Sequence, residues 1–205
     1  MDLFPMFVKL RGRLAVVVGG GRLADSKIGN LLSAGARIRI VAPQVKNTIS
    51  GLVAAGKVEL RTKTFEPEDL AGAFLAITAT GVPGVNQEVF REAEARGILC
   101  NAVDDPERCH FYYPAVVRRG ALQIAISTNG LSPALAQRLR RELESQFGPE
   151  YEAWLAWLGS VRNILRAQSA ATEDTRETLH FLASKEIFDW FQSRLRVKKL
   201  SRSHA

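Results

Sequence analysis

Short apolar runs alternate with stretches of helical periodicity along the first half of the chain. Residues 14–18 form a continuous apolar, β-branched run, which is typical of a buried parallel strand. Residues 24–34 then carry apolar side chains at helical spacing and end at Gly35, and 37–41 is a second strand-like run. The pattern predicts a β-α-β unit with a right-handed crossover.

The same alternation continues as far as residue 103. Further helices are predicted over 45–55 and 86–96, and further strands over 58–60, 74–77 and 98–103. Strands and helices that alternate with short connections indicate an α/β fold, a Rossmann-like doubly wound parallel sheet. We expect this domain to span residues 1–113.

The pattern changes after residue 113. The elements expected there are two strands over 112–117 and 122–127 that form a β-hairpin, and helices over 133–147, 151–166 and 173–191. Ser132 and Pro133 are the predicted N-cap and first residue of the first of these helices. We therefore expect a small hairpin and helix region over 114–148 and a helical C-terminal domain over 149–205.

The composition is that of an ordinary globular protein, with 46% apolar and 24% charged residues. No apolar run approaches the ~18 to 20 residues of a membrane span. The first ten residues carry no basic head and no small-residue cleavage site of a signal peptide. We expect a cytoplasmic protein without a membrane partner.

The net charge of +7 is concentrated in the C-terminal tail. This tail supplies five of the seven charges, through Arg194, Arg196, Lys198, Lys199 and Arg202. A basic tail of this kind is more often solvated and disordered than a nucleic-acid arm. We expect a disordered tail and no nucleic-acid partner.

The cysteines and histidines do not predict a metal site. Cys100 ends an apolar run and is expected to be a buried small hydrophobe, whereas Cys109 lies in a polar loop. Their spacing does not fit a zinc site, and His110 and His180 lie 70 residues apart.

A glycine-rich turn follows the first predicted strand. Gly19, Gly20 and Gly21, with Ala24 three residues on, fit the G-x-G-x-x-G/A pattern of dinucleotide-binding folds. The first glycine permits the turn, the second lets the backbone approach a pyrophosphate, and the small third residue lets helix pack on strand. The alternative is a glycine turn without a ligand. No acidic residue ends the second strand, so the choice between NAD and NADP stays open.

Polar residues follow the fourth and fifth predicted strands. Thr80 and Asn101 are expected to line the cofactor side of the carboxyl edge, where open α/β sheets bind ligands. Asp104 at the same edge is a candidate general base. The alternative is that these are ordinary turn residues.

A second candidate site precedes the helix that begins at Pro133. Ser127, Thr128 and Asn129 stand beside a helix N-terminus, which favours anions. Together with Arg118 and Arg138 they are candidates for binding a polycarboxylate substrate. The alternative is that these arginines are solvated surface charges.

Several segments of the chain together form a recognisable set: the opening LFPMF at 3–7, LRGR at 10–13, VVVGGG at 16–21, AGA at 34–36, VAP at 41–43, FEPEDL at 65–70, AT at 79–80, NAVDDP at 101–106, YPA at 113–115 and ISTNGLSPALA at 126–136. In these segments the chain resembles the precorrin-2 dehydrogenase domain of siroheme synthases, over about residues 2–147.

This resemblance implies NAD-dependent oxidation of precorrin-2 to sirohydrochlorin in siroheme biosynthesis. It implies that Asp104 is the catalytic acid-base residue, and that NAD lies near Arg22, Leu23, Pro43 and Gln44. It also implies a homodimer formed through residues 114–148. The implied substrate carries many carboxylates, which the arginines would bind. No methyltransferase segment follows, so we do not expect the trifunctional form.

Two alternative functions stay open. Some members of this family also insert ferrous iron, which makes a bifunctional dehydrogenase and ferrochelatase one alternative. Four positions depart from the usual family pattern: Thr128 and Asn129 replace a serine and a glycine, Ser26 stands where an arginine is usual, and Gly81 where an aspartate is usual. A non-catalytic protein that binds NAD or a tetrapyrrole is therefore the other alternative.

Overall fold

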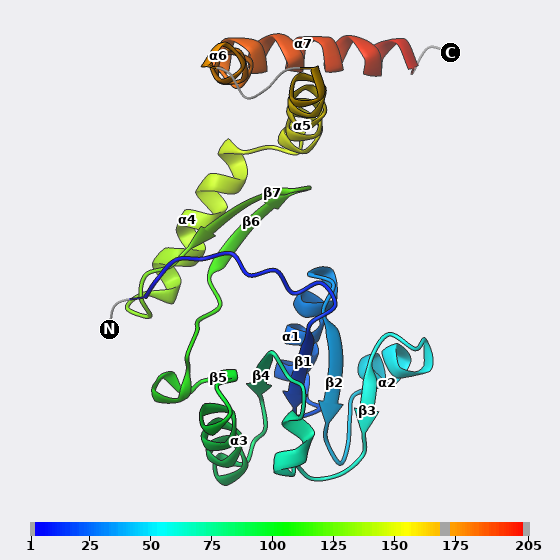
Figure 1. Cartoon of the computed structure of the whole chain (residues 1–205), viewed down its shortest axis with the longest axis vertical. Helices are drawn as coiled ribbons and strands as arrows, with labels where there is room; N and C mark the ends of the chain where they lie inside the picture. The colour runs from blue at the N-terminus through cyan, green and yellow to red at the C-terminus, as the bar shows by residue number, and fades with distance from the viewer. Residues whose placement is uncertain (1–2, 169–172, 203–205) are drawn as a thin grey trace. The chain divides into compact units, whose positions relative to one another are not determined.

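The computed structural model describes residues 3–168 and 173–202. The chain forms two compact units that divide between Tyr113 and Pro114 (Figure 1). Each unit is described separately below.

The first unit is built on a five-stranded parallel sheet with strand order β3-β2-β1-β4-β5. The strands are β1 (Leu14–Val18), β2 (Arg37–Val41), β3 (Glu59–Arg61), β4 (Leu75–Thr78) and β5 (Leu99–Ala102). The chain winds outward from β1 in one direction and then in the other, so the predicted doubly wound Rossmann-like sheet is confirmed.

Strand β1 lies at the centre, and its five residues are all buried. Ala15 and Val17 belong to an apolar cluster with residues of α1 (Arg22–Ser33) and α2 (Asn47–Ala54). Leu14, Val16 and Val18 belong to a second cluster with residues of α3 (Pro83–Ala95). The continuous apolar run is thus explained by helices on both faces, and each buried aliphatic side chain stabilises the fold by about 1.5–3 kcal/mol.

Helix α1 ends just before Gly35, as the sequence pattern predicted. Ala34 is its C-cap, and Gly35 follows with φ of 76°, the left-handed conformation that commonly ends a helix. Short 3-10 helices, η1 (Pro67–Leu70) and η2 (Pro106–Arg108), complete this unit and were not predicted.

The second unit begins with the predicted hairpin, in which β6 (Ala115–Arg119) pairs antiparallel with β7 (Leu122–Ile126). Helix α4 (Pro133–Gln146) follows, and the Leu135 backbone N–H donates to the Ser132 hydroxyl at 3.2 Å. The predicted N-cap at Ser132 is therefore confirmed. Helix α5 (Glu150–Gln168) comes next, and its Trp154 is buried in a cluster of rings with Trp157, Phe188 and Phe191.

Two predictions for the C-terminal region were wrong. The single helix over 173–191 is two helices, α6 (Glu173–Leu182) and α7 (Lys185–Arg202), because the Ser184 hydroxyl accepts from the Ile187 N–H at 3.4 Å and starts a new helix. The basic tail from Arg194 was expected to be disordered, but its backbone continues α7 to Arg202. None of the helices described combines the length and apolar character that a membrane crossing requires.

Candidate functional site

The carboxyl ends of the three central strands of the first unit lie side by side. Val18 of β1 pairs with Thr78 of β4, and Thr78 pairs with Ala102 of β5. Backbone hydrogen bonds extend the pairing between these strands by one residue: the Ala79 N–H donates to the Val18 carbonyl at 2.8 Å, and the Val103 N–H donates to the Thr78 carbonyl at 2.9 Å. The loops that follow these strands therefore start at one edge of the sheet.

The glycine turn at this edge has a distinct packing requirement at each position. A Cβ on Gly19, whose φ is 120°, would lie 2.5 Å from the Ala79 carbonyl oxygen, and one on Gly20 would lie 2.1 Å from the Gln44 carbonyl oxygen. A Cβ on Gly21 would meet nothing within 4 Å. Gly19 and Gly20 thus allow the backbones to pack closely, whereas Gly21 faces open space. Ala24 is fully buried, as the third position of the pattern requires.

Gly21 is the N-cap of α1, and no side chain caps the helix there. The first N–H groups of α1 are therefore available to an external acceptor, and the helix dipole favours an anion at this end. Such a helix start, approached through open space at a glycine, fits the pyrophosphate of a dinucleotide.

The structure brings the residues expected to hold NAD to this turn. Arg22 and Leu23 are exposed in the first turn of α1, and Pro43 and Gln44 are exposed after β2. The Lys46 N–H donates to the Gly20 carbonyl at 3.0 Å and ties the two loops together. These residues therefore border one surface at the carboxyl edge.

Asn86 of α3 is a polar residue at this edge that the sequence analysis missed. Its side-chain oxygen accepts from the hydroxyl of the buried Thr78 at 2.5 Å and lies 2.6 Å from the hydroxyl of Thr80. Its amide group donates to the Thr80 carbonyl at 3.2 Å. Asn86 thus fixes the turn after β4, and a lone asparagine in a helical stretch carries no sequence signal for this role.

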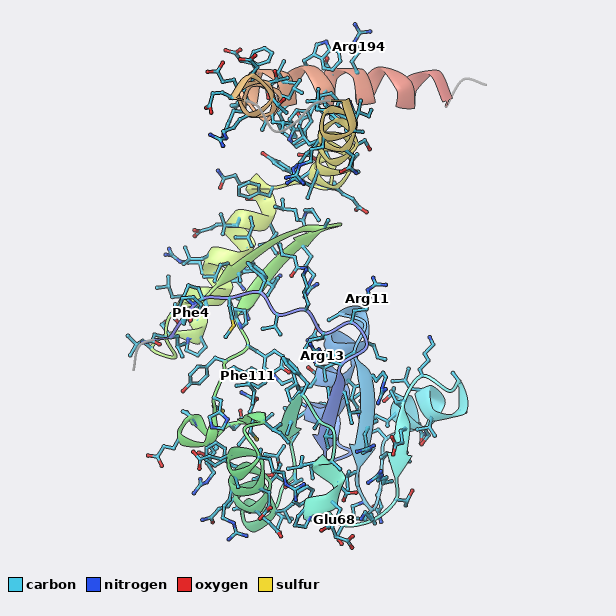
Figure 2. The ribbon with its side chains drawn as sticks, in the orientation of Figure 1. Phe4, Arg11, Arg13, Glu68, Phe111 and Arg194 are labelled. Carbon is cyan, nitrogen blue, oxygen red and sulfur yellow. The ribbon has the colours of Figure 1, made fainter. Side chains whose placement is uncertain are left out.

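Asn101 and Cys109 shape the loop that carries Asp104. The buried Asn101 donates from Nδ2 to the Phe111 carbonyl at 2.8 Å and to Cys109 Sγ at 3.3 Å (Phe111 is labelled in Figure 2). The Cys109 thiol lies 3.1 Å from the Ala102 carbonyl oxygen. The side chain of Asn101 therefore holds the returning chain in place.

Asp104 occupies the top of this loop in the left-handed conformation, with φ of 65°. Aspartate tolerates this conformation better than most residues. Asp104 is exposed at the carboxyl edge, where its carboxylate is accessible to a substrate.

The two cysteine thiols lie in different surroundings. Cys100 is fully buried in β5, as predicted, and burial raises the pKa of its thiol to about 12. Burial also raises the pKa of Cys109, more than its hydrogen bond to the Ala102 carbonyl lowers it. Both cysteines are therefore thiols at neutral pH.

Lys27 of α1 is a second residue that the sequence analysis did not assign to the site. Its Nζ lies 3.8 Å from the centroid of the Tyr113 ring, a cation–π contact. Burial lowers the pKa of Lys27, and the charges of Asp104 and Cys109 oppose this effect only in part. The ammonium group therefore occupies a partly desolvated position, where the charge of Asp104 acts on it.

The candidate anion-binding loop of the second unit is held by its own hydroxyl groups. Ser127 Oγ accepts from the Asn129 N–H at 3.1 Å, and Thr128 Oγ1 donates to the Ser132 carbonyl at 3.0 Å. Arg118 is exposed on β6. Arg138 of α4 is also exposed, and its Nε lies 3.6 Å from a carboxylate oxygen of Glu142.

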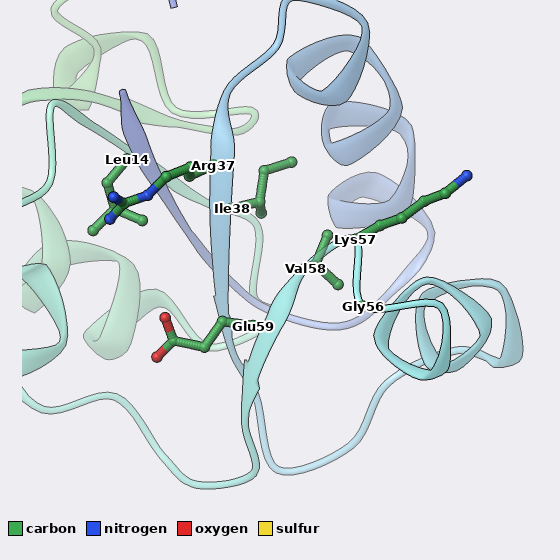
Figure 3. Close-up of a pocket in the computed structure, with 7 residues that line it drawn as sticks. All are labelled: Leu14, Arg37, Ile38, Gly56, Lys57, Val58 and Glu59. Carbon is green, nitrogen blue, oxygen red and sulfur yellow. The ribbon is translucent and has the colours of Figure 1, made fainter. Parts of the chain in front are cut away.

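A surface hollow of about 320 Å³ lies elsewhere, at the amino ends of the strands (Figure 3). Its lining includes Leu14, Arg37 and Glu59, which begin β1, β2 and β3. Because open α/β sheets bind ligands at the carboxyl edge, this hollow is not the dinucleotide site. Within 3–168 and 173–202, no three His, Cys, Asp or Glu residues form a group able to hold a metal ion.

Two family models match the chain. Residues 6–115 match a family described as putative NAD(P)-binding, and residues 119–146 match one described as sirohaem biosynthesis protein central.

The curated relatives are longer proteins. The siroheme synthase of Methylobacillus flagellatus is 38% identical over 176 residues, which cover 86% of this chain and 38% of the relative. The siroheme synthase of Pseudomonas paraeruginosa is 44% identical over 166 residues, which cover 81% of this chain and 36% of the relative. The chain thus spans less than half the length of these relatives.

One similar solved structure is described as SirC, precorrin-2 dehydrogenase. It superposes with a TM-score of 0.76 at 30% sequence identity, and the match covers 90% of this chain and 91% of that one.

Proposed function

The chain belongs to the NAD(P)-binding family of sirohaem biosynthesis that includes the precorrin-2 dehydrogenase SirC, and we propose that it oxidises precorrin-2 to sirohydrochlorin with NAD. The substrate is a tetrapyrrole that carries many carboxylates. The proposal rests on the family and on the geometry of the carboxyl edge.

One observation supports the proposal above the others: the glycine turn and Asp104 follow strands two positions apart at the same sheet edge. Gly19 follows β1, and Asp104 follows β5, with β4 between them. Neighbouring strands lie about 4.8 Å apart, so the two loops start about 10 Å from each other. A dinucleotide bound at the glycine turn is long enough to extend over this distance of about 10 Å along the sheet edge to the loop of Asp104.

The residues present fit NAD. The uncapped start of α1 at Gly21 suits the pyrophosphate, and Arg22, Leu23, Pro43 and Gln44 border the same surface. We propose that Thr80 and Asn101 complete the cofactor side, where Asn86 and Phe111 hold them in place. NAD, when bound, supplies the acceptor for a hydride.

Asp104 provides the second part of the chemistry. The dehydrogenation removes one hydride and one proton from the tetrapyrrole, and the Asp104 carboxylate takes the proton on a side-chain oxygen. The exposed position of Asp104 lets a large ligand approach, and the hydrogen bonds of Asn101 hold its loop.

We propose that the second unit binds substrate carboxylates through Ser127, Thr128, Asn129, Arg118 and Arg138. The support is the loop before α4, whose backbone takes the left-handed conformation at Asn129 and Gly130. Arg118 supplies an exposed cation.

The test is anaerobic incubation of the protein with precorrin-2 and NAD. The expected result is one NADH formed for each sirohydrochlorin, with both absorbance changes at the same rate. Tight binding of both ligands without any absorbance change would instead support the non-catalytic alternative. The ferrochelatase alternative is tested separately: the protein is incubated with sirohydrochlorin and Fe²⁺ without NAD, and iron insertion is measured.

We further propose a cytoplasmic homodimer whose interface includes residues 114–148, with the helical domain over 149–205. Apolar side chains on this region support the proposal, since Leu131 is 88% and Leu135 is 38% exposed. Light scattering at several protein concentrations measures the oligomeric state.

A further inference from the structure

Lys27 lies on the inner side of α1, where apolar residues are the rule. Its neighbours one turn before and after it, Ala24 and Leu31, are buried against the sheet. The Lys27 stem follows this side of the helix, and its ammonium ends 3.8 Å from the centre of the Tyr113 ring. The charge is therefore held by packing at a defined place.

The ammonium group has no anionic partner in the part of the chain that is described. No carboxylate oxygen there lies within 4.0 Å of Lys27 Nζ, although Asp104 is near enough for its charge to act on it. Lys63 shows the contrast, since it pairs with Glu66 at 2.6 Å and with Asp69 at 3.3 Å.

A partly desolvated cation without an anionic partner is unfavourable in the free protein, and the contact with the Tyr113 ring offsets this cost only in part. Burial accordingly lowers the pKa of Lys27. The arrangement becomes favourable when an anion occupies the space beside the ammonium, because charge-assisted hydrogen bonds are stronger than neutral ones.

We propose that Lys27 is a substrate-recognition residue whose ammonium binds one peripheral carboxylate of the tetrapyrrole beside Asp104. The inference rests on the proposed function, which supplies a substrate rich in carboxylates. Binding one of them at Lys27 fixes the macrocycle relative to the Asp104 carboxylate.

The cofactor pyrophosphate is the other anion near α1, but the position of Lys27 argues against it. Lys27 is six residues beyond the N-cap Gly21, about 9 Å along the helix axis. It contacts Tyr113, near the loop of Asp104, rather than the glycine turn.

The test compares wild type with Lys27→Met, which keeps the stem and removes the charge, and with Lys27→Arg, which keeps a cation. Lys57→Met is the matched control, because Lys57 is exposed at the amino edge of the sheet (Figure 3). Titration with sirohydrochlorin and, separately, with NAD gives the Kd of each ligand.

We expect Lys27→Met to weaken sirohydrochlorin binding about tenfold or more, whereas Lys27→Arg and Lys57→Met stay within about threefold of wild type. The KM for precorrin-2 should rise more than kcat falls, and the salt dependence of Kd should become shallower in Lys27→Met. The Kd for NAD and the melting temperature should stay unchanged in all variants.

An unchanged Kd for sirohydrochlorin in Lys27→Met overturns the inference. A selective loss of NAD affinity also overturns it, in favour of the pyrophosphate. A lower melting temperature with equal loss of both ligands indicates a structural role and overturns it as well. If wild type binds sirohydrochlorin but does not oxidise precorrin-2, the proposed function fails, while the titrations still decide the role of Lys27.

Discussion

Asp69 is a fully buried carboxylate of η1, and its replacement by asparagine should destabilise the first unit. Its Oδ1 accepts from Arg61 Nη1 at 2.7 Å, and its Oδ2 accepts from the Glu66 N–H at 3.0 Å and lies 3.3 Å from Lys63 Nζ. Asparagine has nearly the same shape but carries no charge and offers one acceptor atom instead of two.

The magnitude follows from these contacts. A hydrogen bond to a charged group contributes about 1.5–3 kcal/mol when buried. The side chains of Arg61 and Lys63 are each 35% exposed, so water replaces part of what they lose. We expect Asp69→Asn to lower the free energy of unfolding by about 2 kcal/mol, which shifts a urea midpoint by about 1 M.

The effect should depend on pH. Burial alone raises the pKa of Asp69, but the hydrogen bonds from Arg61 and the Glu66 backbone outweigh it and hold the pKa below its ordinary value of 3.8. A lowered pKa in the folded state stabilises the protein above the unfolded pKa, and this contribution disappears as the pH falls through the folded pKa. The difference between wild type and Asp69→Asn should therefore be constant near pH 7 and narrow below about pH 4.

Urea unfolding followed by two signals tests this prediction. The three tryptophans, Trp154, Trp157 and Trp190, belong to the second unit, so fluorescence reports on that unit and far-UV circular dichroism on both. The control is Glu68→Gln, because Glu68 is exposed on the same 3-10 helix and points away from it (Figure 2). Equal urea midpoints of the circular dichroism signal for Asp69→Asn and wild type at pH 7 would refute the reasoning.

Three further predictions concern the carboxyl edge. Asp104→Ala should lower kcat at least about 100-fold and leave the Kd for NAD within about twofold; normal turnover would remove Asp104 from the mechanism. Gly20→Ala should lower the melting temperature, because its Cβ would lie 2.1 Å from a backbone carbonyl oxygen, whereas Gly21→Ala should leave the melting temperature unchanged and weaken NAD binding. Equal effects of the two glycine substitutions would contradict the division of roles. Asn86→Leu should cost about 1–3 kcal/mol in chemical denaturation, because it leaves the buried Thr78 hydroxyl without its acceptor; an Asn86→Asp control should retain most of the stability.

Local patterns were sufficient to predict most of the first unit. The apolar run of β1 and the helical spacing of α1 are properties of consecutive residues, and burial on both faces of the sheet requires just this pattern. The same method failed at Ser184, because apolar spacing continues across the break between α6 and α7 and the serine cap is a single hydroxyl.

The candidate site was predicted in part. The glycine turn and Asp104 carry signals in the sequence, since strand ends in a parallel sheet meet at one edge. The assignment of roles within the turn needed the structure, because close packing at Gly19 and Gly20 depends on Ala79 and Gln44, which belong to other loops.

The sequence by itself determined the order of strands and helices in the first unit, the position of the glycine turn and the edge of the sheet where we propose that the chemistry takes place. These features depend on periodicity, glycine and chain direction, which are local. The tertiary structure alone decided which polar groups meet. The cation of Lys27 contacts Tyr113 across 86 positions of sequence, and Asn86 and Asn101 bind partners that belong to other elements. Such contacts depend on how elements pack, and packing leaves no periodic signal along the chain.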